Sequence, residues 1–259
     1  DTAEFSIRDN TVNLNQTRQD TGDGTDVMRD IENVKGGSGD DTITGNRESN
    51  ALYGEAGDDE LWSGLGEEDN YLYGGADDDT LYGCRTSDDL FHGGTGLDTV
   101  VFTNTANDNT VDLRKTDAQD TQEGEDIFRS IENINCGNGD DTIIGDESNN
   151  IFMGEAGNDI LKGLDGHDVL IGGAGIDNLW GGGGNDIFRL GTASSSRDII
   201  KDFEDGSDKI HITQDWSTIS WNGDGGGNVE IYDGVDLVAL VMNTGAADLT
   251  WNGTLDHLI

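Results

Sequence analysis

The stretch GGAGIDNLWGGGGNDIFR, residues 172–189, contains the same nine-residue pattern twice. In each copy glycines come first, and an aspartate stands at the sixth position (Asp177 and Asp186). A large apolar residue follows at the eighth position (Leu179 and Phe188). A period this strict is typical of repeat proteins, in which each copy adds one structural unit to a stack.

The pattern occurs in two arrays inside a larger duplication. Nonapeptides fill residues 136–189 without insertion, whereas the earlier array contains irregular copies. Residues 26–45 match residues 126–145, so the whole cassette is duplicated. The sequence therefore predicts three regions: a first cassette at 1–97 (irregular 1–35, nonapeptides 36–97), a second at 98–189 (irregular 98–135, nonapeptides 136–189), and a cap and secretion-signal region at 190–259.

The spacing predicts a coil of short parallel strands. Glycines at positions one, two and four allow a tight turn through positive φ, and positions six to nine leave as a strand with one apolar side chain inside. Two nonapeptides make one turn of a flattened right-handed coil, so residues 18 apart stack at about the 4.8 Å strand spacing. We therefore expect an all-β fold: a right-handed parallel β-roll, or β-helix solenoid, with a C-terminal β-rich cap.

Stacked aspartates at this spacing predict a bound cation. Asp159 should lie over Asp177 on one edge, and Asp168 over Asp186 on the other. Such carboxylates repel each other unless a cation lies between them. The turns offer carboxylate and carbonyl oxygens, which select a hard ion, and flexible glycine carbonyls suit Ca²⁺ better than Mg²⁺. His167 stands at a variable position, which favours a solvated turn residue over a ligand.

The charge balance supports the same conclusion. Fourteen Lys and Arg face 54 Asp and Glu, a formal net charge of −40 over 259 residues. Self-repulsion on this scale opposes compaction and makes nucleic acid an unsuitable partner. We therefore expect a chain that is disordered without a cation and folded with one. No run of 18 apolar residues is present, so no membrane span is predicted.

The motif GGxGxDxUx resembles that of the RTX (haemolysin-type calcium-binding) family, over roughly residues 36–101 and 136–189. The resemblance implies a parallel β-roll with Ca²⁺ between successive turns. Asn50 and Asn150 depart from the motif, and calcium sites that touch them should be weaker or absent. The ligands that the resemblance implies are side chains of Asp41, Asp59, Asp79, Asp88, Asp98, Asp141, Asp159, Asp168, Asp177, Asp186, Asn50 and Asn150, with carbonyls of Gly37, Gly39, Gly137, Gly139, Gly173, Gly175, Gly182 and Gly184.

Stacked pairs suggest roughly eight or nine Ca²⁺ ions in the chain. A second set of regularly spaced acidic residues could hold an ion, or it could consist of carboxylates that are solvated in loops. Solvated carboxylates are favoured because the set lacks the order of ligands found in an EF-hand. Its residues are Asp20, Asp23 and Asp26, repeated as Asp120, Glu123 and Asp126.

The two cysteines leave an alternative open. Cys84 and Cys136 both stand where the repeat expects glycine, which places them in turns. Two free thiols are favoured over a disulfide.

Catalytic motifs are missing from the sequence. It contains no HExxH, GxSxG or GxxxxGK, and its four histidines are scattered. We therefore expect a non-catalytic chain, with the alternative that it is the tail of a secreted protease, lipase or epimerase.

The C-terminal region suggests export. Residues 185–212 resemble the element that ends RTX arrays in type I secreted proteases and epimerases, and VEIYD and DLVALVM should form strands over the end of the roll. The tail LTWNGTLDHLI resembles uncleaved type I secretion signals. Asp1 matches the sixth position of a nonapeptide, which indicates a piece of a longer protein.

The predicted function is a calcium-binding module that folds on Ca²⁺ and supports type I secretion of a larger bacterial exoprotein. Its expected partners are calcium, the type I secretion machinery and an upstream domain of the same protein, and its expected location is extracellular. An alternative is a calcium-dependent module that binds an acidic, alginate-like polysaccharide.

Overall fold

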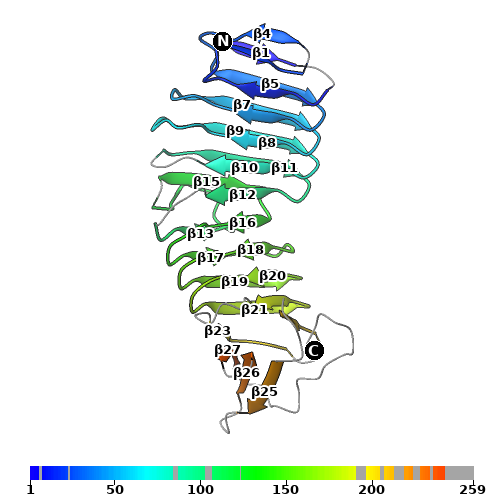
Figure 1. The fold of residues 1–259 in the computed structure, drawn as a ribbon, viewed down its shortest axis with the longest axis vertical. Coiled ribbons are helices and arrows are strands. Elements are labelled where there is room, and N and C mark those ends of the chain that lie inside the picture. The colour runs from blue at the N-terminus through cyan, green and yellow to red at the C-terminus, as the bar shows by residue number, and fades with distance from the viewer. Residues whose placement is uncertain are drawn as a thin grey trace. The chain divides into compact units, whose positions relative to one another are not determined.

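The structure is a computed structural model that describes residues 1–5, 8–22, 24–83, 87–102, 107–122, 124–190, 197–204, 207–212, 219–223, 228–233 and 236–242. Throughout these residues the regular elements are strands joined by turns (Figure 1). A helix that could span a membrane is not found in this part of the chain. The all-β prediction is confirmed.

The chain forms two compact units. Unit 1 contains Asp1–Thr105 and Lys115–Asn135, and unit 2 contains Ala106–Arg114 and Cys136–Ile259. Contacts define these units, whereas repeated sequence defines the expected cassettes 1–97 and 98–189. The cassette boundaries therefore stay a prediction.

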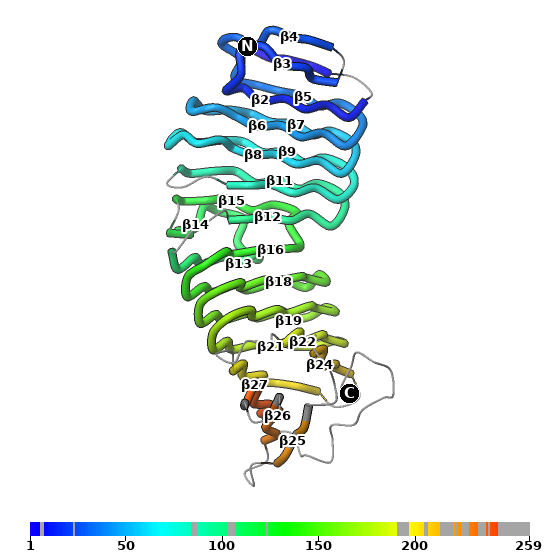
Figure 2. The backbone as a smooth tube through the Cα atoms, viewed as in Figure 1, coloured from blue at the N-terminus to red at the C-terminus, as the bar shows by residue number. Residues whose placement is uncertain are grey.

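Unit 1 is a stack of short strands in two parallel sheets, and its chain winds from one sheet to the other (Figure 2). The first sheet has the order β1 (Thr2–Glu4), β5 (Asn33–Ser38), β7 (Ala51–Ala56), β9 (Tyr71–Ala76), β11 (Leu90–Thr95), β15 (Glu125–Arg129), with β14 (Gln119–Asp120) added antiparallel. The second has the order β2 (Thr11–Asn13), β6 (Thr42–Thr44), β8 (Glu60–Trp62), β10 (Thr80–Gly83), β12 (Thr99–Phe102), β16 (Asn133–Asn135). A hairpin of β3 (Arg18–Asp20) and β4 (Thr25–Val27) lies in the irregular segment.

Unit 2 repeats this arrangement. One sheet begins with β13 (Thr110–Asp112), β17 (Thr142–Ile144), β19 (Ile160–Gly166), β21 (Asn178–Gly184) and β23 (Asp198–Ile200). It continues with β27 (Asp236–Val241), β26 (Val229–Asp233) and β25 (Ile219–Gly223). The other pairs β18 (Ile151–Met153), β20 (Val169–Ile171), β22 (Ile187–Leu190) and β24 (Lys209–Ile212).

The register confirms the predicted stacking. Leu161 pairs with Ile143 on one side and Leu179 on the other, so residues 18 apart lie side by side. The irregular segments form wider turns of the same coil, since Thr99 pairs with Asn133.

The eighth position forms the core of each unit. Its side chains are fully buried, as expected from one inward apolar residue per strand, and Phe152, Leu161 and Leu170 are among the largest of them. Neighbouring positions face outward and are half-buried, as the alternation of a strand requires.

The strands predicted from VEIYD and DLVALVM are confirmed as β26 and β27. Strand β27 pairs in parallel with β23, and β26 and β25 follow antiparallel. They extend the sheet of unit 2 beyond the last nonapeptide. The proposed secretion signal at 249–259, Cys84, and Asp23 and Glu123 of the second acidic spacing lie outside the described residues.

Candidate metal centres

The sixth-position aspartates are buried despite their charge. Relative exposure is 0–1% for nine of them. They are Asp41, Asp59, Asp79, Asp98, Asp141, Asp159, Asp168, Asp177 and Asp186. Because burying an ionised carboxylate without a partner is costly, something must compensate these charges in the folded chain.

One oxygen of each carboxylate has a backbone partner. The backbone N–H of Asp159 donates to Oδ1 of Asp177 at 2.8 Å, and that of Asp168 donates to Oδ1 of Asp186 at 2.9 Å. The donor in each case lies one turn earlier. The predicted stacking of Asp159 with Asp177 and of Asp168 with Asp186 is therefore found, as a ladder of hydrogen bonds along each edge.

Among the described residues, no hydrogen-bond donor reaches the second oxygen of these carboxylates. Ten buried Oδ2 atoms share this property. They belong to Asp41, Asp59, Asp79, Asp98, Asp141, Asp159, Asp168, Asp177, Asp186 and Asp198. An unsatisfied buried acceptor costs about 1–3 kcal/mol, and more when it is charged.

Eight of these Oδ2 atoms lie against the first glycine of their own turn, and in the turn of Asp141 the first residue is Cys136. A Cβ on Gly163 would lie 2.0 Å from Oδ2 of Asp168 and 2.7 Å from the carbonyl oxygen of Gly181. The same relation holds at Gly154, whose added Cβ would be 2.2 Å from Oδ2 of Asp159. In these eight turns glycine at position one leaves room for the carboxylate. The expectation of positive φ there is wrong, since Gly163 and Gly154 are not among the residues with positive φ.

Positive φ is found at positions two and four. Gly182 has φ 96° and Gly184 has φ 142°. A Cβ on Gly182 would lie 1.7 Å from the carbonyl oxygen of Leu164, one turn earlier. The eight glycines whose carbonyls were predicted as ligands all have positive φ, as required for this turn. Carbonyl oxygens of one turn thus face the backbone of the next.

Burial raises the pKa of these carboxyl groups. The pKa is about 7 for Asp159 and Asp168 and about 8 for Asp79, against an ordinary 3.8. Burial is the largest cause in each case, neighbouring carboxylates raise the pKa further, and the backbone hydrogen bond to Oδ1 lowers it. Without a counter-charge, these sites hold protons near neutral pH.

The donor set fits a hard cation. Unpaired carboxylate oxygens and turn carbonyls are oxygen ligands of the kind that Ca²⁺ prefers. No group of three or more His, Cys, Asp or Glu side chains that could hold a metal is found among the described residues. A site built here would therefore combine one or two carboxylates with backbone carbonyls.

One predicted ligand is misplaced by one residue. In the irregular turn before β11, the buried sixth-position residue is Asp89, whose Oδ1 accepts the N–H of Asn70 at 2.8 Å. Asp88 is exposed, and its Oδ1 accepts the N–H of Glu125 at 2.9 Å. The assignment of Asp88 to the sixth position is wrong because this repeat has ten residues, and the extra residue lies before the aspartate.

The structure adds members to the ladders that the sequence pattern missed. Asp198 Oδ1 accepts the N–H of Asp177 at 3.4 Å, and Asp208 Oδ1 accepts that of Asp186 at 3.0 Å. In unit 1, Glu132 accepts the N–H of Asp98 and Asp126 accepts that of Asp89. None of these four acidic residues lies in a regular nonapeptide. Asp198 and Asp208 each stand just before apolar residues typical of a strand, and this signal could have identified them in the sequence.

His167 and one acidic segment have structural partners. The N–H of His167 donates to Oδ1 of Asn149 at 2.8 Å, and its ring Nδ1 accepts the N–H of Asn185 at 2.9 Å. Its position is exposed. Oδ2 of Asp126 accepts a hydrogen bond from the Thr121 hydroxyl, so this residue of the second acidic spacing is held within the protein.

Comparison with known proteins gives a family match for the repeats. The family model of the RTX calcium-binding nonapeptide repeat matches four segments, at residues 35–67, 66–83, 132–161 and 162–192. A comparison with curated protein sequences gives no match. Among solved structures, the extracellular lipase LipA from Serratia marcescens is 16% identical with a TM-score of 0.30. The similarity covers 83% of this chain and 44% of the lipase, so the chain spans less than half of that protein.

Proposed function

Because this chain carries RTX calcium-binding nonapeptide repeats, we propose that it is a non-catalytic module whose folding depends on Ca²⁺ in its turns. The observation that carries this proposal is the set of ten buried Oδ2 atoms without a donor. These carboxylates, with carbonyls of positions two and four, would hold the ions, roughly eight or nine of them. The ions would supply the positive charge that the stacked carboxylates lack.

The charge of the chain supports a role in secretion. A net charge of −40 keeps a metal-free chain expanded. We propose that the chain stays extended where calcium is low, passes a type I exporter, and folds outside the bacterium from its C-terminal cap outward. In this proposal it is part of a larger exoprotein and follows an upstream domain.

The decisive measurement is circular dichroism of the purified chain during a calcium titration, with magnesium as control. We expect a cooperative coil-to-β transition that is specific to calcium. A β spectrum unchanged by thorough chelation would contradict the proposal. A variant with Asp159→Ala, Asp168→Ala and Asp177→Ala should lose the transition, because it removes carboxylates from both edges of unit 2.

A second candidate function is binding of an acidic polysaccharide. Strand register aligns one outward row across unit 1, made of Lys35, Tyr53, Tyr73, His92 and Arg129. The ring centroids of Tyr53 and Tyr73 lie 4.8 Å apart in a stacked arrangement. Retention on immobilised alginate, with and without calcium, tests this candidate, and the row predicts weaker retention after Arg129→Ala.

A further inference from the structure

The turns of this protein fall into two hydrogen-bonding classes. In the open class, Oδ2 of the sixth-position aspartate is buried without a donor. Nine fully described turns belong to it. They end at Asp41, Asp59, Asp79, Asp98, Asp141, Asp159, Asp168, Asp177 and Asp186.

In the closed class, the turn satisfies its own sixth residue. Oδ1 of Asn50 accepts the N–H of Asn46 at 2.7 Å, and Oδ1 of Asn150 accepts that of Asp146 at 3.2 Å. Oδ2 of Asp208 accepts the N–H of Glu204 at 2.8 Å by the same four-residue spacing.

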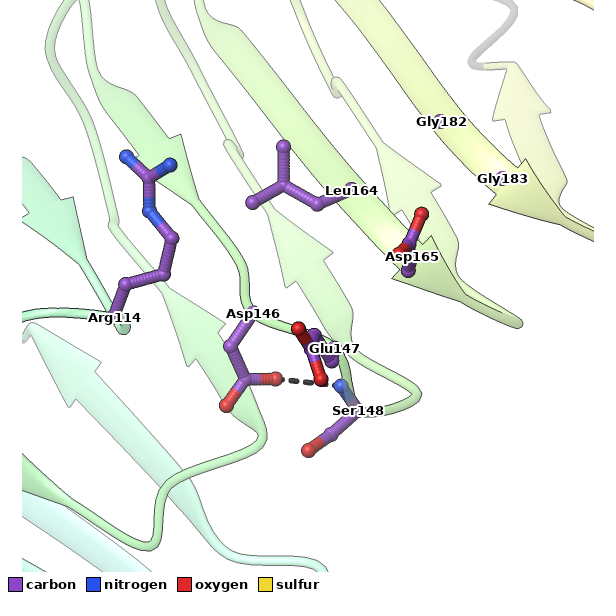
Figure 3. Close-up of a pocket in the computed structure, with 8 residues that line it drawn as sticks. All are labelled: Arg114, Asp146, Glu147, Ser148, Leu164, Asp165, Gly182 and Gly183. Carbon is purple, nitrogen blue, oxygen red and sulfur yellow. Dashed lines mark hydrogen bonds between the residues drawn. The ribbon is translucent and has the colours of Figure 1, made fainter.

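A further hydrogen bond fixes each asparagine turn. Oδ1 of Asp146 accepts the N–H of Ser148 at 2.7 Å (Figure 3), and Oδ1 of Asn46 accepts that of Glu48 at 2.8 Å. Position two therefore closes the turn from within, as Asp and Asn side chains do in Asx turns.

The side-chain oxygen occupies the same place in both classes. A Cβ on Gly145 would lie 2.3 Å from Oδ1 of Asn150, and one on Gly163 would lie 2.0 Å from Oδ2 of Asp168. The classes thus differ in whether a donor reaches this oxygen, and not in where the oxygen lies.

Backbone conformation separates the nine open turns from the two asparagine turns, and the longer turn before Asn70, in which Gly64 has φ 110°, belongs to neither group. Positions two and four have positive φ in all nine open turns, even where position two is Glu55, Glu155 or Leu164. None of the corresponding residues in the asparagine turns (Asn46, Glu48, Asp146 and Ser148) has positive φ. Positive φ at a non-glycine residue costs of order 1–3 kcal/mol. In the open turns that contain Glu55, Asp77, Glu155 or Leu164, backbone strain therefore adds to the cost of the unpaired carboxylate, and both need an external compensation.

The open turns are distributed unevenly. In unit 1 they lie on one edge, between the first and second sheets, at Asp41, Asp59, Asp79 and Asp98. The opposite edge of unit 1 carries Asn50, Asn70 and Asp89, and none of these has an Oδ atom among the unpaired ones. In unit 2 open turns occur on both edges.

We propose that only the open turns bind calcium. In unit 1 the ions then lie along one edge, that of Asp41, Asp59, Asp79 and Asp98. The closed turns, at Asn50, Asn150 and Asp208, fold without an ion. The inference rests on the proposed function, since it specifies which turns of the array hold calcium. It assigns a determining role to position two: a residue with positive φ leaves the turn open, and Asn46 or Asp146 closes it.

The test converts one closed turn into an open one in the full chain. Asp146→Gly, Ser148→Gly and Asn150→Asp together change GDESNN into GGEGND, the sequence type of an open turn. Calcium per chain, measured by atomic emission after equilibrium dialysis, should rise by about one ion, because the new turn stacks on the open turn of Asp168.

A matched variant makes the opposite change. Glu155→Asp, Gly157→Ser and Asp159→Asn introduce the closed sequence into the open turn 154–159, and at least one ion should be lost. Both variants are compared by circular dichroism in saturating calcium. An unchanged ion count in a folded gain variant would overturn the inference.

Anomalous scattering from calcium in crystals of the unaltered protein provides a test that needs no variant. Peaks are expected on one edge of unit 1, and a peak beside Asn50 or Asn150 would refute the two classes. A chain that binds no calcium would instead refute the proposed function, so the two failures are distinguishable.

Discussion

At the scale of single residues, the two carboxylate oxygens of the sixth-position aspartate have opposite effects on stability. Its Oδ1 is paired, and stabilises the ladder between turns, as in the 2.8 Å bond from Asp159 to Asp177. Its Oδ2 is buried without a donor. The same side chain therefore stabilises the stacking and destabilises the metal-free fold.

Asp159→Asn separates these two effects. Loss of the charge should weaken calcium binding, and should stabilise the chain in chelator by about 1–3 kcal/mol, because an unpaired buried acceptor is no longer ionised. Calorimetry measures calcium binding, and the concentration of trimethylamine N-oxide needed to fold the chain in chelator measures the change in stability without metal. Asp140→Asn is the matched control, since Asp140 is exposed and its Oδ1 accepts the N–H of Asn158. Equal effects of the two substitutions would contradict this account.

The raised pKa values predict opposite pH dependences with and without metal. The folded-state pKa of Asp159 and Asp168 is about 7, above the ordinary 3.8, so the folded chain binds more protons than the unfolded chain between these values. Stability without metal is therefore present below about pH 4 and falls as pH rises through 7.

Calcium must displace the same protons, so its affinity should rise over this range. Circular dichroism in chelator and calcium titrations at pH 5, 6, 7 and 8 check both trends. A metal-free chain that folds better at pH 8 than at pH 5 would contradict the assignment.

At the scale of the turn and strand, space at position one limits the sequence. A Cβ on Gly181 would lie 2.3 Å from Oδ2 of Asp186, whereas a Cβ on Gly183 meets only Oδ1 of the exposed Asp165, at 3.1 Å. Gly181→Ala should therefore weaken calcium binding and lower the unfolding midpoint in calcium. Gly183→Ala should change both quantities little, because the Asp165 side chain can move. Thermal unfolding of the two variants in saturating calcium is the comparison, and equal losses would argue against it.

At the scale of the whole molecule, two kinds of repulsion can be distinguished. The net charge of −40 acts over long distances, whereas the buried carboxylates act between adjacent turns. Sodium chloride at 1 M reduces the screening length to about 3 Å, which removes the long-range part. Buried groups are screened much less.

High salt should therefore compact the metal-free chain without folding it. Size-exclusion chromatography and circular dichroism in chelator, with and without 1 M sodium chloride, test this expectation. If salt alone produced the β spectrum, net charge rather than the buried carboxylates would control folding.

The sequence by itself determined the period, and with it most of the fold. Regular spacing placed an apolar residue inside each strand and an aspartate at each turn, so stacking at 18 residues and burial of the eighth position follow from counting. The oxygen-only composition of the turns likewise indicated a hard cation.

Only the tertiary structure decided which turns are open. Counting residues along the chain assigned Asp88 to the sixth position, and this was wrong because the repeat contains one inserted residue. In the structure Asp89 occupies the sixth position, since its N–H donates to Asp126 of the next turn. Asp198 joins a ladder from outside the nonapeptides because β23 pairs with β21. Asp168 and Asn150 differ in whether a backbone N–H donates to the buried side-chain oxygen. The sign of φ at position two follows the same division, and Leu164 shows that a residue other than glycine can have positive φ there. The structure is needed to see this division because Glu55, Glu155 and Leu164 adopt positive φ at position two although they are not glycine.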